Sequence, residues 1–169
     1  MNHYLVLTVI ADDRPGIVEK VAQAVTRHQG NWMESSMARL VGKFAGILLV
    51  EVSDAEKDSL IASLAKLSSD GINITVEDSN QESHEEKEAI CIEIVANDRA
   101  GIVGEISSLM AQNGVNLESL ETFCESAPMS ADMMFHAEAY IQLPDNMSRE
   151  DLTLLLESLS DDLMVETID

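Results

Sequence analysis

Two short loops of similar sequence carry the residues best suited to binding a small charged molecule. The first is DDRPGIVEKV, Asp12–Val21, and the second is NDRAGIVGEI, Asn97–Ile106. Each places an acid and an arginine before a glycine and an apolar run. We expect Asp13 to cap a helix that holds Pro15 in its first turn. Such a helix start leaves open N–H donors, which suit a carboxylate or another anion.

Asparagines recur in step with the loops. Asn31 and Asn116 follow Asp13 and Asp98 at the same spacing, and each precedes the next predicted strand. An amide side chain both donates and accepts hydrogen bonds. A zwitterionic amino acid needs donors for its carboxylate and acceptors for its ammonium, and loop amides, aspartate and asparagine supply both. The competing interpretations are that the loops only begin helices and that the asparagines only make turns.

Other chemistries have less support in the sequence. The loops lack the glycine spacing of a phosphate-binding or dinucleotide-binding loop. Cys91 and Cys124 are isolated thiols, which we expect to be buried or half-buried, and the four histidines lack metal-site spacing. No nucleophile lies in a recognisable elbow. We therefore expect a protein with no catalytic residues, no metal and no cofactor.

The elements around the loops form a repeat. Apolar runs typical of buried strands precede the loops at Leu5–Ala11 and Ile90–Ala96, and helical apolar spacing follows them. Each unit continues with two strands, a helix and a last strand. The second helices begin at predicted capping boxes, Ser53–Glu56 and Ser148–Asp151. The order βαββαβ, twice, predicts an α+β fold of two ferredoxin-like domains, each a four-stranded antiparallel sheet with two helices on one face.

The predicted domain boundaries follow from composition. The first domain is residues 1–79, the second is residues 89–169, and the polar, acidic linker is residues 80–88, NQESHEEKE, with no apolar residue. No apolar run approaches the roughly 18 residues of a membrane helix. The amino terminus carries no export signal, so we expect a cytoplasmic protein that does not enter a membrane.

The chain is strongly acidic, with a net charge of −21 from 31 acids and 10 bases. Such a chain repels a phosphate backbone, so we expect no direct nucleic-acid binding. RNA-recognition domains share the βαββαβ order, but the middle strands here lack their stacking aromatics. The charge is uneven, since residues 1–79 hold 11 acids and 7 bases and residues 89–169 hold 16 and 2. The acidic second half serves either solubility or a basic protein partner.

The loop sequences resemble those of a known family. DDRPGIV and NDRAGIV after a strand, with GNW and GVNL after the helix, resemble two ACT domains, the small regulatory modules that bind amino acids. The tandem pair is similar to the glycine cleavage system transcriptional repressor family. This resemblance implies a ligand cleft where two ACT units meet edge to edge, with the loop of one unit facing the strand start of the other. It also implies action on a DNA-binding activator rather than on DNA.

The resemblance carries a set of ligand-binding positions onto this chain. The positions that it implies are Asp13, Arg14, Pro15, Gly16, Ile17, Asn31, Asp98, Arg99, Gly101, Ile102 and Asn116. Aspartate stands in both loops where relatives often have asparagine, which favours an ammonium over a carboxylate. Ala100 replaces the usual proline, and the bulk of Trp32 predicts a narrowed or closed cleft beside Asn31.

Taken together, the residues and the resemblance predict a non-catalytic sensor. A small amino acid, with glycine as the first candidate, would favour one arrangement of the two units by its differential affinity, and a partner protein would read that arrangement allosterically. The expected partner is a transcription regulator of amino-acid metabolism or a metabolic enzyme, and we expect a homo-oligomer. The alternative is an ACT-type regulatory or interaction subunit of an amino-acid or one-carbon metabolic enzyme, with no ligand of its own.

Overall fold

The computed structural model describes residues 1–79 and 88–168, and the chain divides into two compact units, Met1–His84 and Glu85–Asp169. The predicted linker, residues 80–88, falls almost wholly outside the described residues, so its role stays a prediction. No helix in the described ranges is long and apolar enough to cross a membrane.

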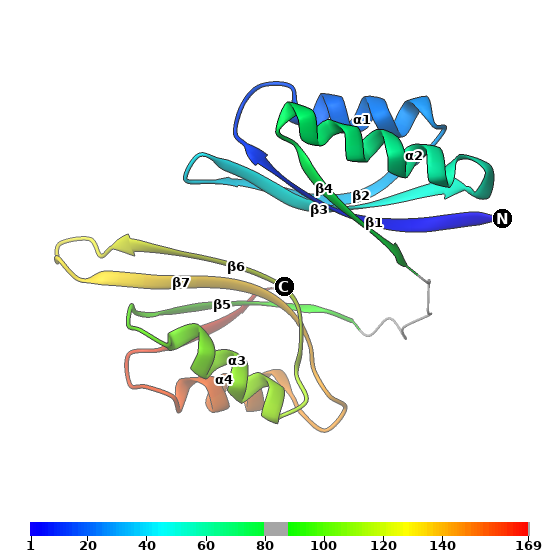
Figure 1. Ribbon diagram of the computed structural model, residues 1–169. Helices are drawn as coiled ribbons and strands as arrows, with labels where there is room; N and C mark the ends of the chain where they lie inside the picture. The colour runs from blue at the N-terminus through cyan, green and yellow to red at the C-terminus, as the bar shows by residue number, and fades with distance from the viewer. Residues whose placement is uncertain (80–87, 169) are drawn as a thin grey trace. The chain divides into compact units, whose positions relative to one another are not determined.

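The first unit is a four-stranded antiparallel sheet in the order β2-β3-β1-β4, with two helices on one face (Figure 1). Its elements run β1 (Asn2–Asp12), α1 (Ile17–Arg27), β2 (Asn31–Leu40), β3 (Lys43–Ser53), α2 (Asp54–Lys66), the 3-10 turn η1 (Leu67–Asp70) and β4 (Asn73–Ser79). The predicted βαββαβ order is therefore confirmed in this unit.

The second unit repeats the plan with the sheet order β6-β7-β5-β8 and its own two helices on one face (Figure 1). Its elements run β5 (Ile90–Asn97), α3 (Ile102–Gln112), β6 (Asn116–Ser126), β7 (Met133–Gln142), α4 (Arg149–Glu157) and β8 (Met164–Ile168). The predicted α+β fold of two ferredoxin-like units is confirmed.

Each unit buries one core between its sheet and its helices. In β1 the alternate residues Leu5, Leu7 and Val9 are fully buried, and they meet Leu60 of α2 in the same apolar cluster. The second unit has an equivalent cluster of its own. Trp32 also packs against the core of the first unit. The indole of Trp32 therefore contributes to the stability of the first unit, in addition to any effect on a neighbouring cleft.

The first helix of each unit begins later than the sequence suggested. Gly16 is the N-cap of α1 with φ 93°, and Gly101 is the N-cap of α3 with φ 86°. A positive φ cannot continue a right-handed helix, so the helix starts one residue after each glycine. The prediction that Asp13 caps α1 is wrong, and Pro15 lies in the turn before the helix rather than in its first turn.

The two predicted capping boxes have different outcomes. Ser148 accepts a hydrogen bond from the N–H of Asp151, whose carboxylate accepts from the N–H of Ser148, so the box of α4 is confirmed. Ser53 is the N-cap of α2, but its side chain forms no cap hydrogen bond. The prediction of a capping box at the start of α2 is therefore wrong. The carboxylate of Glu56 instead lies 3.3 Å from Nδ1 of His28, at the C-terminal end of α1.

Candidate functional site

The first loop, between β1 and α1, is anchored on both sides. The N–H of Asp13 donates to the carbonyl of Gly42 at 2.9 Å, at the tip of the β2–β3 hairpin. The carboxylate of Asp13 lies 3.3 Å from the guanidinium of Arg39 in β2. On the other side, Arg14 donates to the carbonyl of Asp70 at the end of η1. Arg14, a predicted ligand residue, is thus already engaged in holding the loop in place.

A hollow of about 220 Å³ opens beside this loop. Its lining residues are Asp13, Arg14, Gly16, Ile17, Val18, Glu19 and Phe44. The first N–H of α1 that bonds back to the loop is that of Lys20, which donates to the carbonyl of Gly16 at 3.0 Å. The N–H groups of the preceding residues, Ile17 to Glu19, have no intrahelical partner. The hollow therefore combines donors for an anion with the carboxylate of Asp13.

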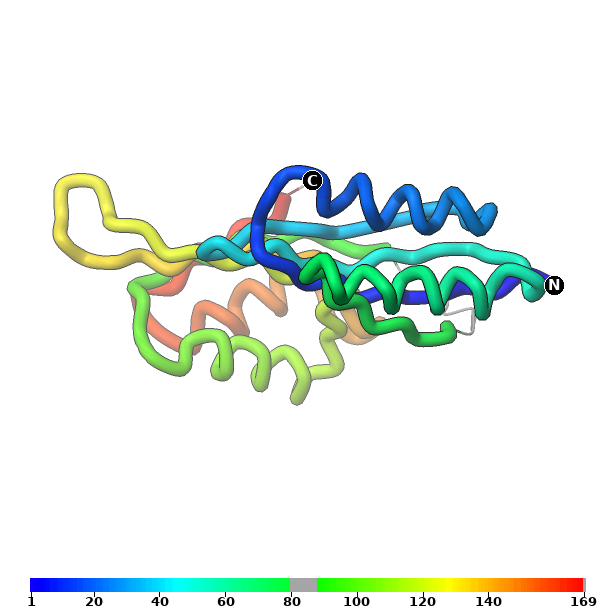
Figure 2. The backbone as a smooth tube through the Cα atoms, turned by 45° about the horizontal axis from the view of Figure 1, so that its top comes forward, coloured from blue at the N-terminus to red at the C-terminus, as the bar shows by residue number. Residues whose placement is uncertain are grey.

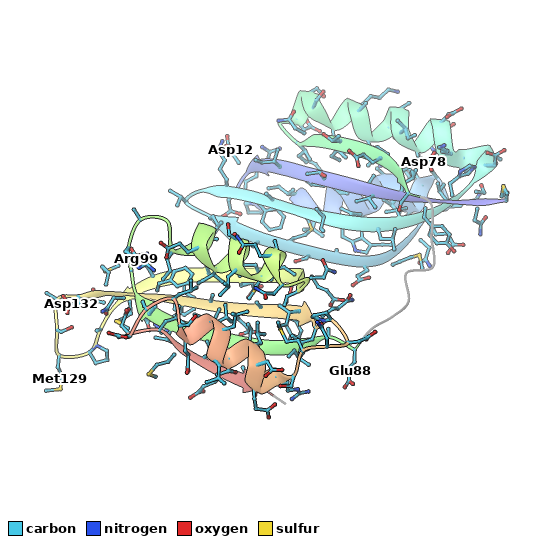
Figure 3. The ribbon with its side chains drawn as sticks, turned by 90° about the horizontal axis from the view of Figure 1, so that it is seen from below. Asp12, Asp78, Glu88, Arg99, Met129 and Asp132 are labelled. Carbon is cyan, nitrogen blue, oxygen red and sulfur yellow. The ribbon has the colours of Figure 1, made fainter. Side chains whose placement is uncertain are left out.

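The second loop, between β5 and α3, has the same backbone anchor but different side-chain contacts. The N–H of Asp98 donates to the carbonyl of Met133 at 2.9 Å. Arg99, which Figure 3 shows in this loop, forms an ion pair with Glu105 of α3. The hydrogen bond between them raises the pKa of Arg99 and lowers the pKa of Glu105. Arg99 is therefore also engaged within its own unit.

The register of the sheets shows that Arg39 and Cys124 occupy equivalent positions. Arg39 is opposite Phe44 across the first hairpin, and Cys124 is opposite Phe135 across the second. The two phenylalanines are themselves equivalent, since each is opposite the last alanine of the strand before its loop. The duplication thus places an arginine beside one loop and a thiol beside the other.

This replacement makes the two loops electrostatically different. Within the described ranges Asp98 forms no ion pair, whereas Asp13 pairs with Arg39. Desolvation by its neighbours and then the negative charge of Asp98 raise the pKa of the Cys124 thiol. Cys124 is exposed, so the expectation that it is buried or half-buried is wrong, while Cys91 is buried. The second loop keeps an uncompensated carboxylate, and the first does not.

The predicted asparagines lie far from the loop of their own unit. Asn31 is opposite Glu51, which is opposite Tyr4 near the start of β1, whereas the first loop follows Asp12 at the other end of that strand. At roughly 3.3 Å per residue, Tyr4 and Asp12 are about 26 Å apart. The side chains of Asn31 and Asn116 are exposed and form no hydrogen bond with other described residues. One unit alone does not bring its loop and its asparagine together.

Sequence reasoning missed four residues of the first loop site: Val18 and Glu19 in the first turn of α1, and Arg39 and Phe44 in the β2–β3 hairpin. Arg39 and Phe44 reach the loop only because the hairpin folds back beside it. The pairing joins residues 26 positions apart, and no local motif marks it. In the part of the chain that the structure describes, no cluster of three or more histidine, cysteine or acidic side chains could hold a metal ion.

Comparisons with known proteins match the first unit to a family model and the whole chain to known structures of the same fold. Residues 3–77 match the family model of the ACT domain. A crystal structure of an unknown protein from Galdieria sulphuraria is 24% identical with a TM-score of 0.78, and the match covers 100% of both chains. A candidate glycine cleavage system transcriptional repressor is 19% identical with a TM-score of 0.75, over 100% of this chain and 99% of that one.

A curated relative matches a shorter stretch. The UPF0237 protein of Methanopyrus kandleri is 39% identical over 51 residues, which are 30% of this chain and 57% of that protein. The match thus spans little more than half the length of this relative. The family model matches the first unit, and the second unit repeats its element order and sheet topology. The first unit therefore matches the ACT domain, and the second unit has the same fold.

Proposed function

We propose that this protein is a non-catalytic regulator that binds a small amino acid between ACT-type units and passes its occupancy to a partner protein. The observation that carries the proposal is the hollow of about 220 Å³ beside the first loop, with the open N–H groups of α1 and the carboxylate of Asp13 at its wall. Pockets for drug-sized ligands span roughly 300–1,000 Å³. A hollow below that range suits a small amino acid.

The difference between the loops suggests which end of the ligand each one takes. Arg39 offsets the charge of Asp13, so the first loop is the better site for a carboxylate, which the N–H groups of α1 would bind. The charge of Asp98 has no such offset among the described residues, so the second loop is the better site for an ammonium. The two loops would then favour different ends of a zwitterion, each at its own site.

The positions of the asparagines favour a site that two units share. Since Asn31 lies about 26 Å along the sheet from its own loop, it reaches a ligand only beside the loop of another unit. That unit belongs to the same chain or to a second copy of it, and the second case would make the protein the homo-oligomer that we expect. A ligand shared by two units favours one arrangement of them by its differential affinity, and couplings of this kind are typically about 1–3 kcal/mol.

The structural likeness to a candidate glycine cleavage system transcriptional repressor makes glycine the first ligand to test. By the same likeness, the partner is a transcription regulator of amino-acid metabolism. The net charge of −21 supports a protein partner over direct contact with nucleic acid.

Calorimetric titration of the full chain with a panel of free amino acids tests the proposal. The expected result is saturable heat with glycine or another small amino acid, and none with matched compounds that lack either the ammonium or the carboxylate. Absence of heat and of any thermal shift with every member would contradict ligand binding. The chain would then be an interaction subunit of a metabolic enzyme, with no ligand of its own.

A further inference from the structure

A larger hollow, of about 500 Å³, lies along α1, α2 and η1 in the first unit, and we call it the helix groove. Figures 1 and 2 show α1 and α2 side by side on one face of the sheet. The residues that line the groove are Lys20, Gln23, Ala24, Arg27, Ser63, Lys66, Leu67, Ser69 and Asp70. Three of them are cations and one is an acid, in a chain with only 10 basic residues.

Most of the positive charge in the helix groove is not neutralised by the protein. Lys20 lies 3.4 Å from the carboxylate of Asp70. Arg27 and Lys66 form no ion pair or side-chain hydrogen bond with other residues in the described ranges. A concave surface lined by charges of one sign concentrates their field. The helix groove is therefore a local anion-attracting surface on a protein whose net charge of −21 repels anions elsewhere.

The second unit shows that the fold does not require these cations. At the repeat offset, Glu105 of α3 takes the place of Lys20, and Gln112 takes the place of Arg27. Neither α3 nor α4 has a basic residue in its last turn, whereas α1 and α2 end with Arg27 and Lys66. Cations at helix C-termini stabilise a helix only modestly. The second unit folds the same way without them.

The spacing of the cations indicates the size of the anion. Lys20 and Arg27 are seven residues apart on α1, which at 1.5 Å per residue is about 10 Å. A single carboxylate or phosphate is much smaller than that separation, so it spans these two helix positions only if both side chains bend toward it. An extended acidic chain rises about 3.3 Å per residue and so presents side chains every second residue at about 7 Å. Several of its acids reach the cations of the helix groove together.

We propose that the helix groove docks an acidic segment of the partner protein. The inference takes from the proposed function only the existence of a partner, and it is independent of amino-acid binding. The proposal also assigns amino-acid binding and partner docking to different surfaces of the first unit, because the loop hollow and the helix groove share no lining residue.

Fluorescence anisotropy with a labelled glutamate-serine peptide, and the full chain without amino acid, tests the proposal. The expected result is saturable binding at low ionic strength that weakens steeply as salt is added, because exposed charges are screened beyond about 10 Å at 0.1 M salt. The double variant Arg27→Gln/Lys66→Gln should bind about 2- to 25-fold more weakly, since exposed charge pairs contribute about 0.2–1 kcal/mol each.

The matched control is Lys43→Gln/Lys57→Gln. It removes the same charge from the same unit, but from lysines that pair with Asp12 and Asp78 outside the helix groove. This control should bind the peptide as the parent does. Equal loss in both double variants, or no peptide binding to the parent at low salt, would overturn the proposal. Inorganic phosphate that binds in an Arg27-dependent manner while the peptide does not would also overturn it, in favour of a small-anion site.

Discussion

The carboxylate of Asp13 lies 3.3 Å from the guanidinium of Arg39 in the first unit. At the equivalent position of the second unit, Arg39 is replaced by Cys124, whose thiol has its pKa raised by desolvation and then by the charge of Asp98. The duplication thus kept the loop backbone and changed the charge around it. If both loops bind an amino acid, each loop contacts a different end of it.

The first prediction concerns the two loop acids. Asp98→Asn should weaken binding of the amino acid by about tenfold or more, because hydrogen bonds to charged groups contribute about 1.5–3 kcal/mol. Asp13→Asn should weaken it less than Asp98→Asn, since Arg39 already offsets the charge of Asp13. Calorimetric titration of both variants provides the comparison. Equal losses would show that the pairing with Arg39 does not distinguish the loops.

The second prediction concerns the glycines that begin the helices. Gly16→Ala should destabilise the protein by about 1–2 kcal/mol, because φ 93° is costly for a residue with a side chain. No atom lies within 4 Å of the added methyl group, so the cost comes from the backbone alone. Urea unfolding monitored by circular dichroism measures it.

Gly104→Ala is the matched control for this substitution. Gly104 lies inside α3, its added methyl group also meets no atom within 4 Å, and its φ is not positive. Alanine should stabilise this site by about 0.5–1 kcal/mol. Destabilisation of similar size at both positions would contradict the assignment of the cost to backbone conformation.

The third prediction concerns the two N-cap serines. Ser148→Ala should cost about 1 kcal/mol, because it removes the acceptor for the N–H of Asp151. Ser53→Ala should cost much less, since the Ser53 side chain forms no cap bond. Thermal unfolding of the two variants, each against the parent, compares them. A larger loss at Ser53 would contradict the observed caps.

The order of elements could be predicted from sequence because each element has a local signature. The nearly continuous apolar run Leu5–Ala11 marks β1, and helical spacing marks α1. The helix starts were harder to predict. Asp13 and Ser53 are residue types that often cap helices, but Asp13 pairs with Arg39, and the side chain of Ser53 forms no cap hydrogen bond. Local sequence shows which side chains can cap a helix, but the partners that compete for them come from the tertiary fold.

The candidate site was only partly predictable for the same reason. The loop backbone and its open N–H groups follow from residue type, and the hollow beside the first loop includes four of the predicted residues, Asp13, Arg14, Gly16 and Ile17. The contribution of Arg39 depends on the register of the β2–β3 hairpin, which no short motif encodes. The distance of Asn31 from its own loop likewise follows from the direction of the strands.

The fourth prediction concerns a row of like charges across the second sheet. Glu138 in β7 is opposite Glu121 in β6 on one side and Glu93 in β5 on the other, and Glu93 is opposite Glu166 in β8. Like charges directly opposite each other in a sheet are destabilising. Glu138→Gln should therefore stabilise the protein by about 0.2–1 kcal/mol, and the gain should shrink as salt screens the charges.

Glu77→Gln in β4 is the control for the glutamate row, because Glu77 is opposite Val6 rather than another acid. Its effect on the denaturation midpoint should be smaller and less dependent on salt. If Glu138→Gln lowers the midpoint, or changes it no more than Glu77→Gln does, the carboxylates in the row do not repel one another as their register suggests.

The most direct test of the central claim is an amide proton-nitrogen correlation spectrum of the full chain, recorded during titration with glycine and then with other small amino acids. The account predicts that the amide signals of Ile17, Val18, Ile102 and Val103, at the starts of α1 and α3, shift and saturate together. Spectra in which these signals stay fixed at every amino-acid concentration would contradict ligand binding at the loops.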